Sequence, residues 1–481
     1  YTTLFRSTPN DYNTAGNFRR FYVKNTTQAG RFQLNWIRLE TGLRKNPKTS
    51  PIVFENDLIS SISMDQETDL TSQTLPSYEM TVECLDVDEI YTPDSDYWKK
   101  QFVAGTLCFL KLGYEIGEDV YYVPFFMGKL TKEPSYSNNG TITFDVAVDW
   151  NGSTNGRDIA MLSQPNDAIG VGGEVVDGVL LRDFIDSNGL FDSYDVFHGY
   201  TDIAESESNY YGMVGATEVR QLVANALGSF IIADAEKIKL LNTVDIQYKE
   251  AGDYLTKYEQ VKYTLDNQPK VGKVVVTRNE HLLALPSEKY SAESSDYIVC
   301  PPNDSVDFTL KLPFFSFGHF SVLVPGEGTG LTVDYGGESI DENGNTVVYM
   351  SIYNSRNTEN TTRPVIIFTP VVDNQYEESE TISDNITDEV YTNDNILITN
   401  EHTVKKVKNV ATFMSDLSNQ YEVDVVQNFQ YEIGDVIKLE TRKNVYKTCV
   451  ITGLKFQLPG STGHVTCRKI FAIDDTPQAG I

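Results

Sequence analysis

The chain has 481 residues, of which 40% are hydrophobic and 22% are charged, and its formal net charge is −29. Binding of nucleic-acid phosphates requires clustered Lys and Arg, so this charge argues strongly against a nucleic-acid-binding surface. No run of about 18 apolar residues occurs, so the sequence predicts no membrane-spanning helix. The 28 Tyr and 24 Phe, with short Thr, Val and Ile runs between Asn, Asp and Gly turns, favour a mainly β protein with a smaller α/β part.

Two regions are predicted before residue 151. Residues 1–30 are polar and show no periodicity, which predicts an N-terminal arm. Residues 31–150 are predicted to form a β domain, because short runs alternate between apolar and polar residues. Its expected strands cover 32–36, 58–64, 79–86, 106–113, 119–130 and 141–149.

An acidic loop connects two of these strands. It contains Asp86, Asp88, Glu89, Asp94 and Asp96. Carboxylate oxygens are suitable ligands for calcium, but the loop has neither the alternating spacing nor the central Gly of a calcium-binding loop. The sequence therefore predicts a solvated loop, with calcium as the less favoured alternative.

Residues 151–250 are predicted to form a small α/β domain. Apolar residues at helical spacing indicate one helix over 178–187 and another that starts at Thr217 and ends at Gly228. A hairpin over 229–234 and 237–241 is expected to follow.

A second β domain is predicted from residues 251–299 and 391–481, with strand 270–278 at its start. Residues 300–390 are interpreted as an inserted β domain, in which the Asn-Gly pair at 343–344 predicts a hairpin turn. The segment 373–394 has eight carboxylates and no Lys or Arg, so it is predicted to be a solvated loop or linker.

The C-terminal region has the clearest order of elements. Val404, Val407, Ala411, Met414 and Leu417 recur at helical spacing, which predicts an amphipathic helix. Strands are expected at 422–426, 436–441, 445–456 and 464–468. A two-residue reversal near Lys443-Asn444 separates the second strand from the third, and two further turns separate the others. The first of these turns contains Gly434 and Asp435, and the second contains Gly460 and Gly463. Glycine permits positive φ and Asp hydrogen-bonds its own backbone, so these four residues are predicted to be structural turn residues.

Two parts of the sequence resemble the tail-hub, or baseplate-hub, proteins of tailed bacteriophages and related contractile injection systems. The first is Ile-Ser-x-Ile-Ser-x-Asp-x-Glu-x-Asp from Ile59, followed by Leu-Pro-x-x-Glu-x-Thr-Val from Leu75. The second is the Gly434-Asp435 turn followed by Val-Ile-Thr-Gly-Leu from Val450. The resemblance implies two tube-type β-barrel domains, with the α/β domain between them and an insertion in the second.

The resemblance also implies a function and partners. A hub is a structural virion protein, and three copies form a ring that joins the tail tube to a distal tip or spike and lets DNA pass. The expected partners are a tail tube or distal tail protein on one face and a tip, spike or tape-measure protein on the other. The expected location is the virion tail, after assembly in the host cytoplasm. The acidic charge has two interpretations, a solvated surface or a tube lumen that repels DNA.

No motif for catalysis, cofactor binding or metal binding is present. The histidines, His198, His281, His319, His402 and His464, are scattered, and no GxSxG, HExxH, GxGxxG or P-loop occurs. The cysteines, Cys84, Cys108, Cys300, Cys449 and Cys467, contain no CxxC pair, so buried reduced thiols are expected. The sequence predicts a protein that is not an enzyme, although two carboxylates among 68 would suffice for glycoside hydrolysis.

A second class of function stays open at this point. A β-rich glycan-binding protein or adhesin of a virion or cell surface would use Tyr side chains and Trp98 to stack on sugars. Such a protein needs an exposed aromatic groove and no central bore, which distinguishes it from a hub.

Overall fold

The computed structural model describes residues 3–5, 22–24, 36–43, 52–116, 119–150, 159–160, 179–194, 207–208, 213–214, 218–234, 237–267, 270–283, 290–293, 297–311, 320–323, 330–340, 346–368, 371–383, 385, 388–417, 419–426, 431–460 and 462–470. Within these ranges the protein is mainly β, as the sequence predicts. In the predicted arm, β1 (Thr3–Phe5) pairs antiparallel with β2 (Tyr22–Lys24), and the other residues of 1–30 lie outside the described ranges.

A fourteen-stranded sheet is the largest element of the fold. Its first half contains β3 (Trp36–Leu43), β4 (Ile52–Glu55), β5 (Ile59–Glu67), β6 (Ser77–Leu85), β7 (Leu107–Ile116), β8 (Asp119–Leu130), β9 (Ser135–Tyr136) and β10 (Thr141–Ala147). Its second half contains β18 (Asp253–Leu255), β19 (Gln260–Asn267), β31 (Asn419–Val426), β32 (Val436–Arg442), β33 (Val445–Leu458) and β34 (Thr462–Lys469). The main path is β19-β31-β34-β33-β5-β6-β10-β8-β7-β3-β4.

The two halves are joined by antiparallel pairing of β33 with β5. The register runs from Gly453 opposite Glu67 to Leu458 opposite Ile62. Gly453 lies where three strands meet, because a Cβ there would be 3.0 Å from the Thr466 Cβ on β34 and 3.6 Å from the Gln66 carbonyl oxygen on β5. A side chain at this position would therefore disturb the junction.

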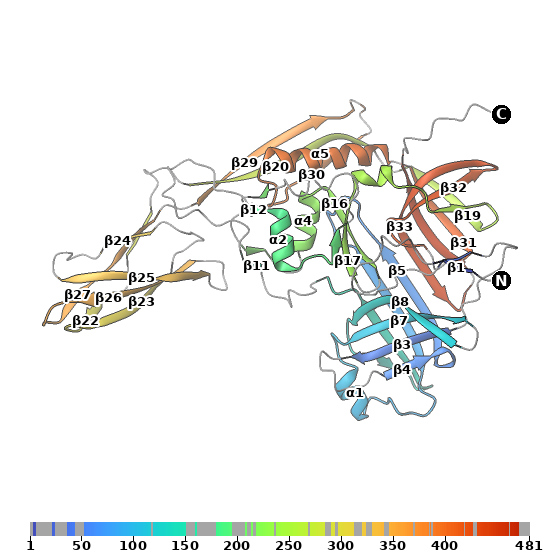
Figure 1. Ribbon diagram of the computed structural model, residues 1–481, viewed down its shortest axis with the longest axis horizontal. Helices are drawn as coiled ribbons and strands as arrows, with labels where there is room; N and C mark the ends of the chain where they lie inside the picture. The colour runs from blue at the N-terminus through green and yellow to red at the C-terminus, as the bar shows by residue number, and fades with distance from the viewer. Residues whose placement is uncertain are drawn as a thin grey trace.

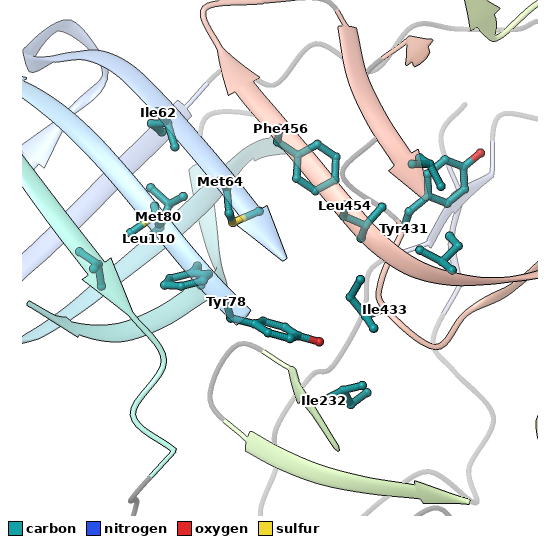
Figure 2. Packing of buried hydrophobic residues seen from close by; sticks show 14 of the residues in the cluster. Ile62, Met64, Tyr78, Met80, Leu110, Ile232, Tyr431, Ile433, Leu454 and Phe456 are labelled. Carbon is teal, nitrogen blue, oxygen red and sulfur yellow. The ribbon is translucent and has the colours of Figure 1, made fainter. Parts of the chain in front are cut away.

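The junction also has a shared hydrophobic core, which Figure 2 shows from close by. Ile62, Met64 and Met80 from the first half and Leu454 and Phe456 from the second belong to one cluster of buried side chains. Each such side chain contributes about 1.5–3 kcal/mol when it is removed from water. The two halves are therefore joined by apolar packing as well as by backbone hydrogen bonds.

The two predicted barrels are not confirmed, because no closed barrel forms among the described strands. The physical reason lies in the edges of β5 and β33. β5 has β6 on one edge and β33 on the other, so no edge remains for closing the first half. β33 pairs with β34 on one edge and divides its other edge between β32 and β5.

The α/β part lies between the long sheet and the inserted domain (Figure 1). Its helices are α2 (Leu181–Asn188), α4 (Val219–Ala226) and α5 (Glu401–Asp416), and its predicted hairpin is β16 (Ser229–Asp234) with β17 (Lys237–Asn242). The predicted end of the first helix is confirmed by Gly189, which has a φ of 58°. Glu218 occupies the N-cap of α4, and the predicted cap Thr217 lies outside the described residues.

Helix α5 is confirmed as an amphipathic helix. Val404, Val407 and Ala411 belong to a second cluster of buried side chains, which also contains residues of α2 and α4. Asn400 caps the helix, since its side-chain oxygen accepts a hydrogen bond from the Thr403 backbone N–H at 2.9 Å. A cap of this type stabilises a helix by about 1 kcal/mol.

The loop between β5 and β6 is fastened to the α/β part by hydrogen bonds. The Thr68 hydroxyl donates to the Ile231 carbonyl at 2.8 Å, and the Thr243 hydroxyl donates to the Leu70 carbonyl at 2.6 Å. The Asn225 amide donates to the Thr71 carbonyl at 2.8 Å. These contacts fix the first half of the long sheet against the α/β part.

Two predictions for this region are wrong. The strand predicted to begin the second β domain is β20 (Val271–Leu283), which does not belong to the long sheet but pairs with β29 (Val371–Thr381) and β30 (Glu389–Asn393). The acidic segment 373–394, which was predicted to be a loop or linker, is therefore largely strand. The charge of one of its carboxylates is compensated by distant residues, because Glu378 lies 3.2 Å from Arg278 on β20 and 3.3 Å from Lys408 on α5.

The inserted domain projects away from both halves of the long sheet (Figure 1). It contains β21 (Tyr290–Glu293), β22 (Ile298–Cys300), β23 (Ser305–Lys311), β24 (Phe320–Leu323), β25 (Leu331–Ile340), β26 (Thr346–Asn354), β27 (Asn360–Thr362) and β28 (Val365–Phe368). β25 and β26 pair as the predicted hairpin, with Ile340 opposite Thr346, and residues 341–345 lie outside the described ranges.

The remaining elements are short. They are α1 (Asp96–Gln101), β11 (Ile159–Ala160), β12 (Val179–Leu180), β13 (Ser193–Tyr194), β14 (Glu207–Ser208), β15 (Met213–Val214) and two 3₁₀ helices, Asn56–Leu58 and Val244–Tyr248.

Candidate assembly surface

The segments that carry the resemblance lie side by side in the structure. The Ile-Ser motif forms β5, the Leu-Pro motif leads into β6, and the Val-Ile-Thr-Gly-Leu motif lies in β33. β33 pairs with β5 and β5 pairs with β6, although the motifs are almost 400 residues apart in the sequence. The junction of the two halves is therefore built from the residues that resemble a hub.

A row of charged side chains crosses this junction. Asp424 on β31, His464 on β34, Lys455 on β33, Asp65 on β5 and Glu79 on β6 lie opposite one another in register. Successive residues of a strand point to opposite faces, and the neighbours of these residues are buried, so the row lies on the face away from the core. The Lys455 Nζ is 2.6 Å from the Asp65 Oδ2, which places an ion pair across the two halves.

Carboxylates outnumber cations on this face among the described residues. The carboxylates are Asp65, Glu67, Glu79, Glu83, Asp145, Asp266, Glu422 and Asp424, and the cations are Lys111, Lys129, Lys262, Lys455 and Arg468, with His464 between carboxylates. Burial lowers the pKa of Arg468, while Asp69 and Glu67 oppose that shift. The result is one continuous polar face of mainly negative charge across both halves.

His464 bridges two carboxylates of the neighbouring strand. Its Nδ1 is 2.9 Å from the Asp424 Oδ1, and its Nε2 is 2.5 Å from the Glu422 Oε2. Burial disfavours the imidazolium, but the hydrogen bonds to Asp424 and Glu422 outweigh burial and raise the pKa of His464 above 6.5. Burial also disfavours ionised Glu422, but hydrogen bonds from His464, Gln420 and Thr466 lower its pKa below 4.5.

This cluster predicts a pH-dependent stability. Because the folded pKa of His464 is raised, its contribution is complete below about pH 6.5 and is lost as the pH rises through the folded value. Glu422 has a lowered pKa, so its contribution is present above about pH 4.5 and is lost as the pH falls through the folded value. We expect the free energy of unfolding in urea to fall by less than about 1 kcal/mol between pH 5.5 and 8.5, because the side chains are partly exposed.

His464→Gln should remove this fall. Lys455→Gln is the matched control, since the pKa of Lys455 is raised above 10.5 and its charge does not change in this range. An equal fall in the wild-type chain and in His464→Gln would refute the role of His464.

The predicted turn at Gly434 and Asp435 connects the second half to the α/β part. Gly434 has a φ of 86°, and a Cβ there would lie 3.0 Å from the Leu241 Cδ1 and 3.7 Å from the Phe230 ring. The Asp435 Oδ2 accepts a hydrogen bond from the Glu432 backbone N–H at 3.0 Å. The conformation and the packing both require glycine here.

The other predicted turn residues lie beyond the end of β33, with Gly460 after its last residue and Gly463 in β34, so the structure does not bring the two turns together. A Cβ on Gly460 would lie 2.7 Å from the Gln457 carbonyl oxygen, and one on Gly463 would lie 3.2 Å from the Lys455 carbonyl oxygen. Neither glycine has a positive φ, so close backbone approach is the reason for glycine at both positions.

Strand β19 forms an edge of the long sheet that the sequence patterns did not predict. It pairs with β31 on one side, and no described strand pairs with its other side. Val261, Tyr263 and Leu265 are 61%, 39% and 46% exposed on one face of the strand. The alternation in the sequence is typical of a strand, but it contains no signal that the strand is an edge.

The acidic loop is held by hydrogen bonds within the fold. The Asp86 carboxylate accepts from the backbone N–H groups of Ile90 and Tyr91 at 2.9 and 2.8 Å, and Ser95 caps α1. In the ranges that the structure describes, no group of three or more His, Cys, Asp or Glu is placed to hold a metal ion. Trp98 packs edge-on against Phe102 and is only 7% exposed, so it does not offer a ring to a sugar.

All five cysteines are free and buried, as the sequence predicts. Burial raises the pKa of the Cys84 thiol well above its usual value, and the neighbouring Cys108 adds to this shift. Across the described ranges, no helix has the length and apolar character needed to cross a membrane.

Comparisons with known proteins give structural neighbours of low similarity. No family model matches the sequence, and no curated protein matches it. The structure is similar to the prophage tail protein gp18 from Listeria monocytogenes EGD-e, with 8% identity, a TM-score of 0.39, and coverage of 90% of this chain and 94% of that one. It is also similar to a chain of the virion of the native gene transfer agent particle, with 9% identity, a TM-score of 0.30, and coverage of 89% and 88%. Alignments with such scores do not establish a shared fold, so the function proposed below rests on this chain's own residues.

Proposed function

We propose that this chain is a structural protein of a phage tail, located in the virion. More specifically, three copies form a hub ring that joins the tail tube to a distal tip or spike. The proposal begins from the hub-like motifs at 59–82 and 432–454, which form neighbouring strands and a turn at the centre of the molecule.

The pairing of β33 with β5 is the observation that carries this proposal. It joins two sheet halves edge to edge within one chain, with a continuous polar face. β19 then leaves a long edge without a described partner at the end of the second half. The other end of the sheet is β4, and a contact between β19 of one copy and β4 of the next would be heterologous. A heterologous contact closes into a ring when its rotation permits.

The charge of the polar face fits passage of DNA through such a ring. Its carboxylates outnumber its cations, so a lumen formed by this face would repel phosphates and would not retain DNA. The proposed partners are a tail tube or distal tail protein on one side of the ring and a tip, spike or tape-measure protein on the other. In this proposal the chain acts by its shape and is not an enzyme.

Substitutions on β19 test the proposal. Val261→Lys combined with Leu265→Lys places charges on the exposed edge, which should block strand pairing between copies. We expect light scattering to give a trimer for the wild-type chain and a monomer for the double variant.

Val87→Lys is the matched control, because Val87 is 72% exposed in the acidic loop of the first half. It should remain trimeric. An unchanged mass for the β19 variant, or the same loss of mass for Val87→Lys, would show that β19 is not the interface.

A further inference from the structure

The three-stranded sheet of the inserted domain has one covered face and one open face. β23, β26 and β25 form this sheet. On the covered face, Leu331 and Ile352 pack with Cys300 of β22 in a small hydrophobic core. The side chains on the opposite face of the sheet do not contribute to this core.

The open face carries two tyrosines on its central strand. Tyr349 and Tyr353 alternate with the buried Met350 and Ile352, and they are 43% and 39% exposed. Four residues of a strand separate the two rings by about 13 Å. Because rings at this spacing are not needed for the core, they are available to contact a ligand.

Polar side chains lie between the two rings. Ser351 lies opposite Asp307 on β23 and opposite Asp334 on β25, so a carboxylate, a hydroxyl and a second carboxylate form one row across the sheet. Asp307 and Asp334 are exposed. Carboxylates accept strong hydrogen bonds from hydroxyl groups, which makes this row suited to a ligand with many hydroxyls.

The orientation of one ring is fixed. The Tyr349 hydroxyl and the Ser339 hydroxyl are 2.9 Å apart, so the Tyr349 side chain extends from β26 across to β25. Tyrosine supplies a large contact area with few rotatable bonds, and a ring that is already held loses little further entropy on binding.

We propose that this open face binds a neutral oligosaccharide. The sugar rings would pack on Tyr349 and Tyr353, and their hydroxyls would donate to Asp307 and Asp334. Charge selects the ligand class, since the two carboxylates lie between the rings and Lys311 lies beyond them, opposite Val347, so sulfated and phosphorylated chains and nucleic acid are disfavoured. The inference is independent of the proposed ring, because it concerns a different sheet at the far end of the molecule (Figure 1).

The test uses the full chain on an array of immobilised neutral oligosaccharides of glucose, galactose, mannose and N-acetylglucosamine, with heparin as the anionic probe. We expect binding to at least one neutral oligosaccharide and none to heparin. Tyr349→Ala and Tyr353→Ala should each weaken this binding at least about tenfold. Asp307→Asn should also weaken it, because the amide accepts hydrogen bonds less strongly than the carboxylate.

Tyr258→Ala is the matched control, since Tyr258 is 97% exposed in the turn between β18 and β19, far from the inserted domain (Figure 1). It should bind as the wild-type chain does. Binding to no neutral oligosaccharide, binding to heparin alone, or equal binding by the tyrosine variants and the wild-type chain would overturn the proposal. Light scattering of the same samples reports separately on the ring, so failure of one proposal is distinguishable from failure of the other.

Discussion

Gly434→Val should lower the free energy of unfolding by about 3 kcal/mol. Two effects add at this position. The φ of 86° is unfavourable for a β-branched residue, and a Cβ would lie 3.0 Å from the Leu241 side chain on β17. The turn also holds β33, because the Gly434 N–H donates to the Ile451 carbonyl at 2.8 Å. Urea unfolding followed by circular dichroism measures the loss.

Gly105→Val separates the two effects. Gly105 has a φ of 82°, and nothing lies within 4 Å of the position of its Cβ. It should therefore show only the conformational cost, about 1–2 kcal/mol. An equal loss in the two variants would show that the contact with Leu241 does not contribute. An unchanged stability of Gly434→Val would contradict the assignment of the turn.

Asn225→Leu should cost about 4 kcal/mol, because it leaves several buried polar groups without partners. The Asn225 Oδ1 accepts from the amides of Asn393 and Asn395 at 2.9 and 2.8 Å, and its own amide donates to the Thr71 carbonyl. Leucine has a similar volume but forms none of these hydrogen bonds. We expect a large fall in the midpoint of urea unfolding.

Gln221→Leu is the control on the same helix. Gln221 is partly exposed and donates one hydrogen bond, to the Gln73 carbonyl. Its loss should cost less than about 1.5 kcal/mol. If the two variants were equally stable, the asparagine cluster would not be what fastens the β5–β6 loop to the α/β part.

Elements with a strong local signal were predictable from the sequence. Helix α5 was predicted from its apolar spacing, and the hairpin of β16 and β17 was predicted from two short apolar runs. In both cases the residues that determine the element are close together in the sequence. The turn at Gly434 belongs to the same class, since its residue types alone indicate a turn.

Features that depend on distant residues were not predictable. Alternation shows which residues of β5 and β33 share a face, but it does not show which strand lies beside them, so open halves were predicted as closed barrels. The acidic segment 373–394 was predicted to be a loop because Arg278 and Lys408, which compensate Glu378, are far away in the sequence. The same limit applies to the row of charges that crosses the junction.

The open edge of β19 is the feature of the structure that favours assembly with another copy. An exposed strand with Val261, Tyr263 and Leu265 on one face invites pairing with another chain. The charged row on the neighbouring strands contributes little to stability as isolated ion pairs, because the side chains are exposed. We infer that the row matters through the mainly negative charge of the polar face, which would line the proposed ring.

The most direct test of the proposed hub ring is the absolute mass of the purified wild-type chain by light scattering, with negative-stain images of the same fractions. Three times the 54.0 kDa of one chain, in rings with an open centre, is the predicted result. A compact monomer at every concentration tested, with no ring in the images, would contradict it.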